Sequence, residues 1–256
     1  MQPYYQIDFS AASCQFEASV NDIPVFTLSV AGQASTMVPI NPGIFQSGKQ
    51  KLSIKLLPLP GELSVSPNAE FKYNIKVFDV NHSFTFKEQL PGYEFPPVDA
   101  SKYYPVLTHE SIFMADVPYT IQAFQNATDL RTMPDLKEQV RAAYQQVADL
   151  IDQAAYDRFK AALANREQIM STTMYLNKQE SDARLQELIT DFQSGFKVEA
   201  LPLDAVVHLY ANGKIAALKK PNGESALTLI DKKTGEELTI ELSVYLPQGK
   251  TTMEVI

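Results

Sequence analysis

The sequence predicts an α+β protein, with an N-terminal antiparallel β-sandwich followed by a C-terminal domain of helices and an antiparallel sheet. Short apolar runs separated by Pro, Gly and Asn fill residues 1–90. Apolar residues then take helical spacing over 132–194, and strand spacing returns over 197–256. Strands followed by helices and further strands are typical of the α+β class. A length of 256 residues is enough for two domains.

Alternation of apolar and polar residues places the strands of the predicted sandwich. Residues 15–20 and 23–30 flank Asn21-Asp22, a plausible two-residue hairpin turn. Gly32 is predicted to open a loop after this hairpin. The remaining strands are predicted at 51–57, 71–78 and 83–87.

Three segments of this region carry a resemblance to a known family, and they are Val20-Asn-Asp-Ile-Pro-Val25, Pro39-Ile-Asn-Pro42 and Ser47-Gly-Lys-Gln-Lys-Leu-Ser-Ile54. Together they resemble the jelly-roll modules that are attached to bacterial glycosidases. The resemblance implies a topology and no particular site. Glycan binding through Tyr4, Tyr5 or Tyr73 is the function that would go with it, although the chain has no Trp for sugar stacking.

Residues 91–131 are rich in Pro and aromatic residues, as in Tyr103-Tyr104-Pro105. Exposed rings are costly, at about 25 cal/mol per Å² of apolar area. We therefore expect 91–131 to be a packed linker that fixes the orientation of the two domains, 1–90 and 132–256.

The C-terminal domain begins with three predicted helices. Thr132-Met-Pro-Asp135 has the residues of a helix start, and an amphipathic stripe follows to Ile151. A second helix is predicted over 154–175, and a third from Ser181 to Ser194-Gly195. From residue 205 the pattern predicts a β-meander, in which Asn212-Gly213 is the strongest hairpin signal.

The stretch from Tyr144 to Phe159 resembles the first helices of the nuclear transport factor two-like superfamily. This resemblance implies a cone-like domain over 132–256, in which a curved sheet wraps a helix hairpin. That fold hosts both enzymes and binding scaffolds, so the resemblance leaves the function open.

Charge and composition exclude several classes of partner. The formal net charge is −8, and no cluster of Lys and Arg suggests a nucleic-acid footprint. An acidic surface instead favours a basic protein partner. No apolar run approaches the ~18–20 residues of a membrane span. No phosphate-binding glycine motif is present, and we expect no cofactor.

The cellular compartment is open to two interpretations. Met1 to Gln6 lacks the pattern of a signal peptide, which fits a cytoplasmic protein or an exported protein whose leader has been replaced by Met1. The Pro- and Tyr-rich β half favours the periplasm or the cell envelope of a bacterium. Cys14 is the only cysteine, so an intrachain disulfide is impossible, and we expect it to be a buried strand residue.

The candidate functional residues do not form a recognised catalytic set. The three histidines, His82, His109 and His208, are too far apart in sequence for a typical metal motif, so we expect neither a metal site nor a catalytic centre. Arg166 falls on the buried stripe of the second helix, where a charge needs a partner. Arg166 is either half of a structural ion pair or an anion binder on the floor of a pocket.

Two main functions follow from these observations. The first is a non-catalytic bacterial binding protein that recognises a basic protein, with an immunity or envelope protein as the most specific version. The second is a small-molecule-binding protein or an enzyme that uses a cavity in the C-terminal domain. The residues expected to line that cavity are Arg166, Tyr144, Tyr175 and His208.

Overall fold

The computed structural model describes residues 1–256 and confirms the α+β class. The chain divides into two compact units. The first unit comprises Met1–Ile121 together with Thr173–Tyr175, and the second comprises Gln122–Thr172 and Leu176–Ile256. All four α-helices of the chain begin in the second unit.

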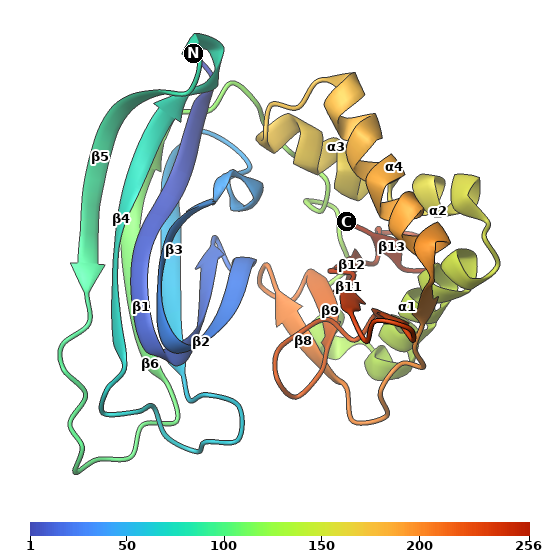
Figure 1. Ribbon diagram of the computed structural model, residues 1–256. Helices are drawn as coiled ribbons and strands as arrows, with labels where there is room; N and C mark the ends of the chain where they lie inside the picture. The colour runs from blue at the N-terminus through green and yellow to red at the C-terminus, as the bar shows by residue number, and fades with distance from the viewer. The chain divides into compact units, whose positions relative to one another are not determined.

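The first unit is built on one antiparallel sheet of six strands, which curves strongly (Figure 1). The strand order is β5-β4-β1-β3-β6, with β2 also paired to β1. The strands are β1 (Pro3–Val20), β2 (Ile23–Pro39), β3 (Gly48–Leu57), β4 (Glu70–Asp79), β5 (Thr85–Glu94) and β6 (Leu107–Ala115). Short 3-10 turns occupy Asn41–Gly43 and Val80–His82.

The curvature brings side chains from distant strands of this sheet into contact. The Tyr73 hydroxyl on β4 lies 2.9 Å from the Ser111 hydroxyl on β6. The ring of Tyr93 on β5 stacks on His109 of β6, with centroids 3.4 Å apart. The single sheet thus forms a half-barrel and covers its own apolar face by curving around it. In a β-sandwich, a second sheet covers that face instead.

Strand β1 changes the face that it buries at Ser13. Ile7 and Phe9 are buried before this point, and Phe16 and Ala18 after it, so the buried positions change from odd to even. Ser13 has a φ of 48°, and the β1–β2 register shifts between Ala12 and Cys14. A bulge of this kind lets one strand serve two segments of a curved core. Accordingly, β1 pairs with β4 along its first part and with β3 along its second.

The predicted hairpin at Asn21-Asp22 is confirmed. Val20 pairs with Ile23, and the two turn residues have φ values of 54° and 65°, as a type I′ turn requires. The predicted loop at Gly32 is wrong, because β2 continues through this glycine to Pro39. Gly32 instead lies near the register shift opposite Ser13, and a Cβ at this position would meet no other atom within 4 Å.

The first unit extends further along the chain than the predicted boundary at residue 90. Strand β6 lies within the range 91–131, and Phe113, Ala115 and Val117 belong to the core of this unit. Ile112 and Met114 alternate with these residues but are exposed. Apolar residues on both faces of β6 hide the strand alternation that would otherwise mark it.

The second unit contains four helices and two small sheets. The helices are α1 (Leu136–Asp152), α2 (Tyr156–Ala162), α3 (Ala164–Thr173) and α4 (Lys178–Ser194). One sheet has the order β11-β10-β7 and the other β13-β12-β9-β8. The strands are β7 (Phe196–Val198), β8 (Val206–Tyr210), β9 (Ile215–Lys219), β10 (Thr228–Asp231), β11 (Glu237–Thr239), β12 (Val244–Tyr245) and β13 (Glu254–Val255).

These two sheets take the place of the single predicted meander. The hairpin at Asn212-Gly213 is confirmed, since it connects β8 and β9. The next strand, β10, leaves this sheet and pairs with β7 and β11. Strand β7 follows α4 directly and is only three residues long, so its sequence pattern is too short to predict its partner.

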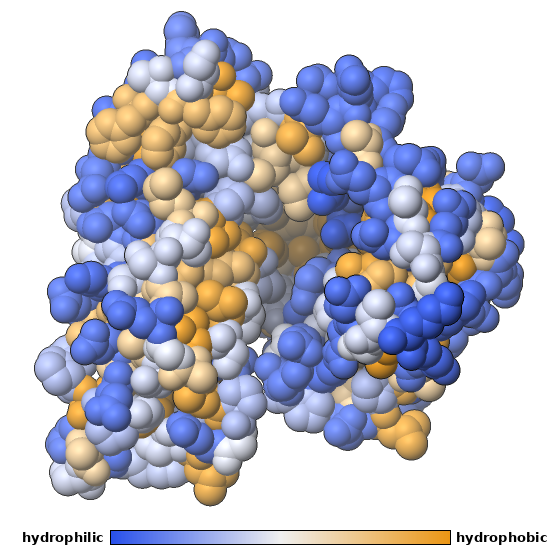
Figure 2. Space-filling model, in the orientation of Figure 1, coloured by the Kyte–Doolittle hydropathy of each residue, from blue (hydrophilic) through white to orange (hydrophobic).

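Two helix predictions need correction, and one is confirmed. Thr132 belongs to a 3-10 turn over Leu130–Thr132, so it does not cap α1. The predicted helix over 154–175 is divided at Leu163 into α2 and α3. Helix α4 is confirmed and begins with a capping box between Asn177 and Glu180. On the face of the molecule that Figure 2 shows, the helical part of the surface is mostly hydrophilic.

Cys14 is fully buried on β1, and burial raises the pKa of its thiol to about 11. Because the thiolate is the reactive form, we expect Cys14 to resist a thiol reagent at pH 8 until the protein is unfolded. Because the thiol ionises more readily in the unfolded chain, its contribution to the free energy of unfolding depends on pH. This contribution is fully present below the ordinary pKa of about 8.5 and is lost as the pH rises towards the folded-state pKa of about 11. Alkylation followed by mass spectrometry, with and without urea, measures the protection. Rapid labelling of the folded protein would contradict it.

Candidate functional site

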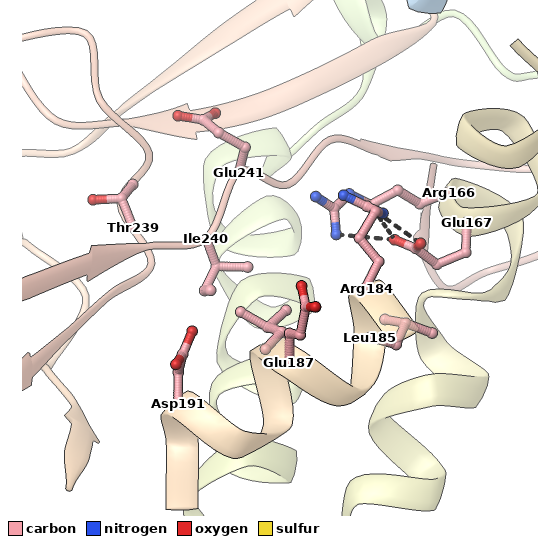
Figure 3. Close-up of a pocket in the computed structure, with 10 residues that line it drawn as sticks. Arg166, Glu167, Arg184, Leu185, Glu187, Asp191, Thr239, Ile240 and Glu241 are labelled. Carbon is pink, nitrogen blue, oxygen red and sulfur yellow. Dashed lines mark hydrogen bonds and ion pairs between the residues drawn. The ribbon is translucent and has the colours of Figure 1, made fainter. Parts of the chain in front are cut away.

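The second unit contains a hollow of about 330 Å³ beside α3, α4 and the segment that follows β11 (Figure 3). Charged side chains dominate its lining. Helix α3 contributes Arg166 and Glu167, and α4 contributes Arg184, Leu185, Glu187, Leu188 and Asp191. The last residue of β11, Thr239, and the two residues after it, Ile240 and Glu241, complete the lining.

The spacing of residues on α4 explains this arrangement. Arg184, Glu187 and Asp191 lie three and then four residues apart, so they occupy one helix face. Ile189 and Phe192 are buried in the core of the second unit on another face. Helix α4 is thereby held by its apolar residues, and its charged row is presented to the hollow.

Glu167 is the centre of the charged cluster. Its side chain is 8% exposed, and Nη2 of Arg184 donates to both carboxylate oxygens at 2.8 Å. Nη1 of Arg166 lies 3.4 Å from the same carboxylate. Two guanidinium groups therefore share one buried acid. Nε of Arg184 is enclosed and has no hydrogen-bond partner.

The environment of Arg166 combines opposing influences on its charge. Burial lowers the pKa of the Arg166 guanidinium, Glu167 raises it, Arg184 lowers it, and Glu241 raises it. The side chain of Arg166 is 20% exposed, so water still reaches part of it. An additional anion near Arg166 and Arg184 would offset the excess positive charge of this cluster.

Three carboxylates line the rest of the hollow. Glu187 and Asp191 are exposed on α4, and Glu241 accepts from Nζ of Lys219 at 2.6 Å. In Figure 3 Glu187 points up from α4 between the arginine cluster and Ile240, and Asp191 lies one helical turn further along. The hollow thus has a cationic part around the arginines and an anionic part formed by these acids.

Only Arg166 among the four predicted ligand-binding residues lines this hollow. Tyr144 is fully buried in the core of the second unit, where its hydroxyl donates to Leu242 O and accepts from Leu218 N. Tyr175 belongs to the first unit and donates to Pro3 O at 3.0 Å. His208 is exposed on β8. The structure does not bring these four side chains together.

Sequence reasoning identified Arg166 but missed its neighbours Glu167 and Arg184. The conflict between charge and burial on α3 was the available signal for Arg166. Arg184 precedes the apolar stripe of α4 by one residue, and nothing in its local pattern distinguishes it from an ordinary exposed arginine. Its pairing with Glu167 depends on how α3 and α4 pack, which local spacing does not encode.

The side chains present limit the chemistry of the hollow. Its lining contains no His, Cys or Ser, so a nucleophile paired with a histidine base is not available there. The lining groups suit ion pairing and hydrogen bonding with a charged ligand. In the first unit, Tyr4, Tyr5 and Tyr73 are buried and do not present the stacking surface proposed for glycan binding.

No protein-family model matches the chain, and no curated protein and no solved structure is significantly similar to it. Among the helices of the structure, none combines the length and the apolar character needed to cross a membrane.

Proposed function

We propose that this protein is a non-catalytic binding protein that recognises a basic protein through the hollow of its second unit. The observation that carries this proposal is the group of carboxylates, Glu187, Asp191 and Glu241, at a hollow that has no catalytic pair. A Lys or Arg side chain of the partner would place its charge among these acids. The net charge of −8 would also speed association with a basic protein.

The most specific version of this proposal is a bacterial immunity or envelope protein. Such a protein binds its partner and blocks or retains it without turnover, which agrees with a site built from ion-pairing groups. The periplasm or cell envelope remains the compartment that the composition of the β half favours. This version makes the partner a basic protein from the same or a competing cell.

The test uses the double variant Glu187→Gln, Asp191→Asn. Both residues are exposed, so the variant should fold normally. A basic protein captured from a native extract by the wild type should be lost by this variant, and calorimetry with the purified partner should show at least about tenfold weaker binding, or 1.4 kcal/mol.

A matched control carries the same change of charge elsewhere. Asp152 and Asp204 are exposed acids of the second unit outside the hollow. The variant Asp152→Asn, Asp204→Asn should bind the partner as the wild type does. Equal weakening by both variants would indicate only a general effect of charge and would contradict the proposed site.

A second candidate function is the binding of a small carboxylate ligand in the same hollow. The specific observation in its favour is that Arg166 and Arg184 share Glu167, while Nε of Arg184 has no partner. Citrate and glutamate are suitable probes for thermal-shift and calorimetric measurements. Binding that is retained by the Glu187→Gln, Asp191→Asn variant but lost by Arg184→Gln would favour this candidate over a protein partner.

A further inference from the structure

Strand β2 is a long edge strand without a charged residue. It spans Ile23–Pro39 and pairs with β1 alone, and no Asp, Glu, Lys, Arg or His occurs in it. Its backbone makes no hydrogen bond to a segment other than β1. An edge of this kind presents unpaired N–H and C=O groups to another strand.

Both faces of β2 are open to solvent over much of its length. Successive residues are exposed at 27–29, at 31–33 and at 35–37, although successive side chains of a strand point to opposite faces. The exposed residues include Leu28 and Met37, at 37% and 45%. Figure 2 shows neutral and apolar colours over this part of the first unit. Apolar exposure on an unprotected strand marks a surface that favours a covering partner.

The other two edges of the same sheet carry the features that prevent pairing. Strand β5 contains Lys87, Glu88, Glu94 and Pro91, and β6 contains Glu110. Charged residues and Pro are the usual protection of edge strands against association. β2 has prolines only at positions 24 and 39, next to its two ends, and it alone of the three edges lacks charged residues.

The charge pattern indicates which partner fits this edge. Copies of a chain with a net charge of −8 repel one another on average, and this repulsion is weakest where neither surface carries a charge. An antiparallel pair of two β2 strands sets uncharged residues opposite uncharged residues in every register. A second copy of the chain can therefore approach along β2 without a local like-charge contact.

We infer that β2 is a dimerisation edge, at which two copies pair their β2 strands antiparallel about a two-fold axis. The two six-stranded sheets would then form one continuous sheet across the interface. Such an interface is isologous, because each copy contributes the same strand. Its position on the first unit makes it independent of the hollow and of the function proposed for it.

The test measures mass in solution by sedimentation velocity over a range of micromolar concentrations. We expect the wild type to form dimers and the variant Ser29→Lys, Ser35→Lys to dissociate more than about tenfold more readily, because residues 29 and 35 lie on one face of β2 and oppose each other across a two-fold axis at Gly32. Gln89→Lys on β5 is the control and should dimerise as the wild type does. Far-UV circular dichroism confirms that each variant is folded.

A charge-complementation experiment separates self-pairing from other causes. The variant Ser29→Asp, Ser35→Asp should also be monomeric alone, and a mixture of the Lys and Asp variants should restore the dimer, because each Lys then opposes an Asp. A wild type that is monomeric throughout, or a mixture that stays monomeric, would overturn the inference. A Lys variant that dimerises as strongly as the wild type would also overturn the inference, since the interface would then lie on another surface.

Discussion

The variant Tyr144→Phe is expected to lower the free energy of unfolding of the second unit by about 2–4 kcal/mol. The Tyr144 hydroxyl joins helix α1 to two other segments, because it donates to Leu242 O at 2.5 Å and accepts from Leu218 N at 3.0 Å. Phe fills nearly the same volume but leaves both backbone groups buried without this partner. Each unsatisfied buried group costs about 1–3 kcal/mol.

Urea unfolding followed by circular dichroism measures this loss. Hydrogen exchange should locate it at the Leu218 amide. Tyr156→Phe is the control, because the Tyr156 side chain has no hydrogen bond and its ring packs at the edge of the same core. We expect a change of less than about 0.5 kcal/mol for this control. Equal stability of Tyr144→Phe and the wild type would show that the Tyr144 hydroxyl has no net stabilising role.

The variant Asn41→Ala should lower the free energy of unfolding of the first unit by about 2–5 kcal/mol. Asn41 is fully buried, its Oδ1 accepts from Tyr5 N at 2.6 Å, and its Nδ2 donates to Pro3 O at 3.1 Å. It thereby satisfies backbone groups at the start of β1. Alanine removes both interactions and leaves a small cavity, and the two costs add.

The control for this variant is Asn68→Ala, which alters an exposed asparagine of the same unit. We expect that change to be almost neutral. In Asn41→Ala, the amides at the start of β1 should exchange faster with deuterium than those of β3. A uniform change throughout the unit, or none, would argue against the local role of Asn41.

The sequence predicts the elements of this fold better than their partners. Asn21-Asp22 and Asn212-Gly213 mark their hairpins because both turns need residues that tolerate positive φ. Pairing between distant strands, such as β1 with β4, leaves no local signal. The break at Leu163 was also missed, since apolar spacing continues from α2 into α3 while Leu163 itself leaves the helical conformation, with φ −92° and ψ 2°.

Of the residues that line the candidate site, only Arg166 was predicted from the sequence. Arg166 stands out because a charged residue occupies an apolar stripe. Tyr144 was expected at a cavity, but an aromatic residue on such a stripe fits a core equally well, and its hydroxyl is satisfied by backbone groups from Leu218 and Leu242. A residue type and a helical position do not show whether the space beside them is filled.

The two successive partners of β1 have a consequence for synthesis on the ribosome. β1 and β2 are adjacent in the chain and can form their hairpin as soon as Pro39 has left the exit tunnel. β4 begins at Glu70, so the first part of β1 has no neighbour on its other side until that segment emerges. Nascent chains that halt in this interval would expose Ile7 and Phe9, which are the kind of apolar segment that chaperones hold.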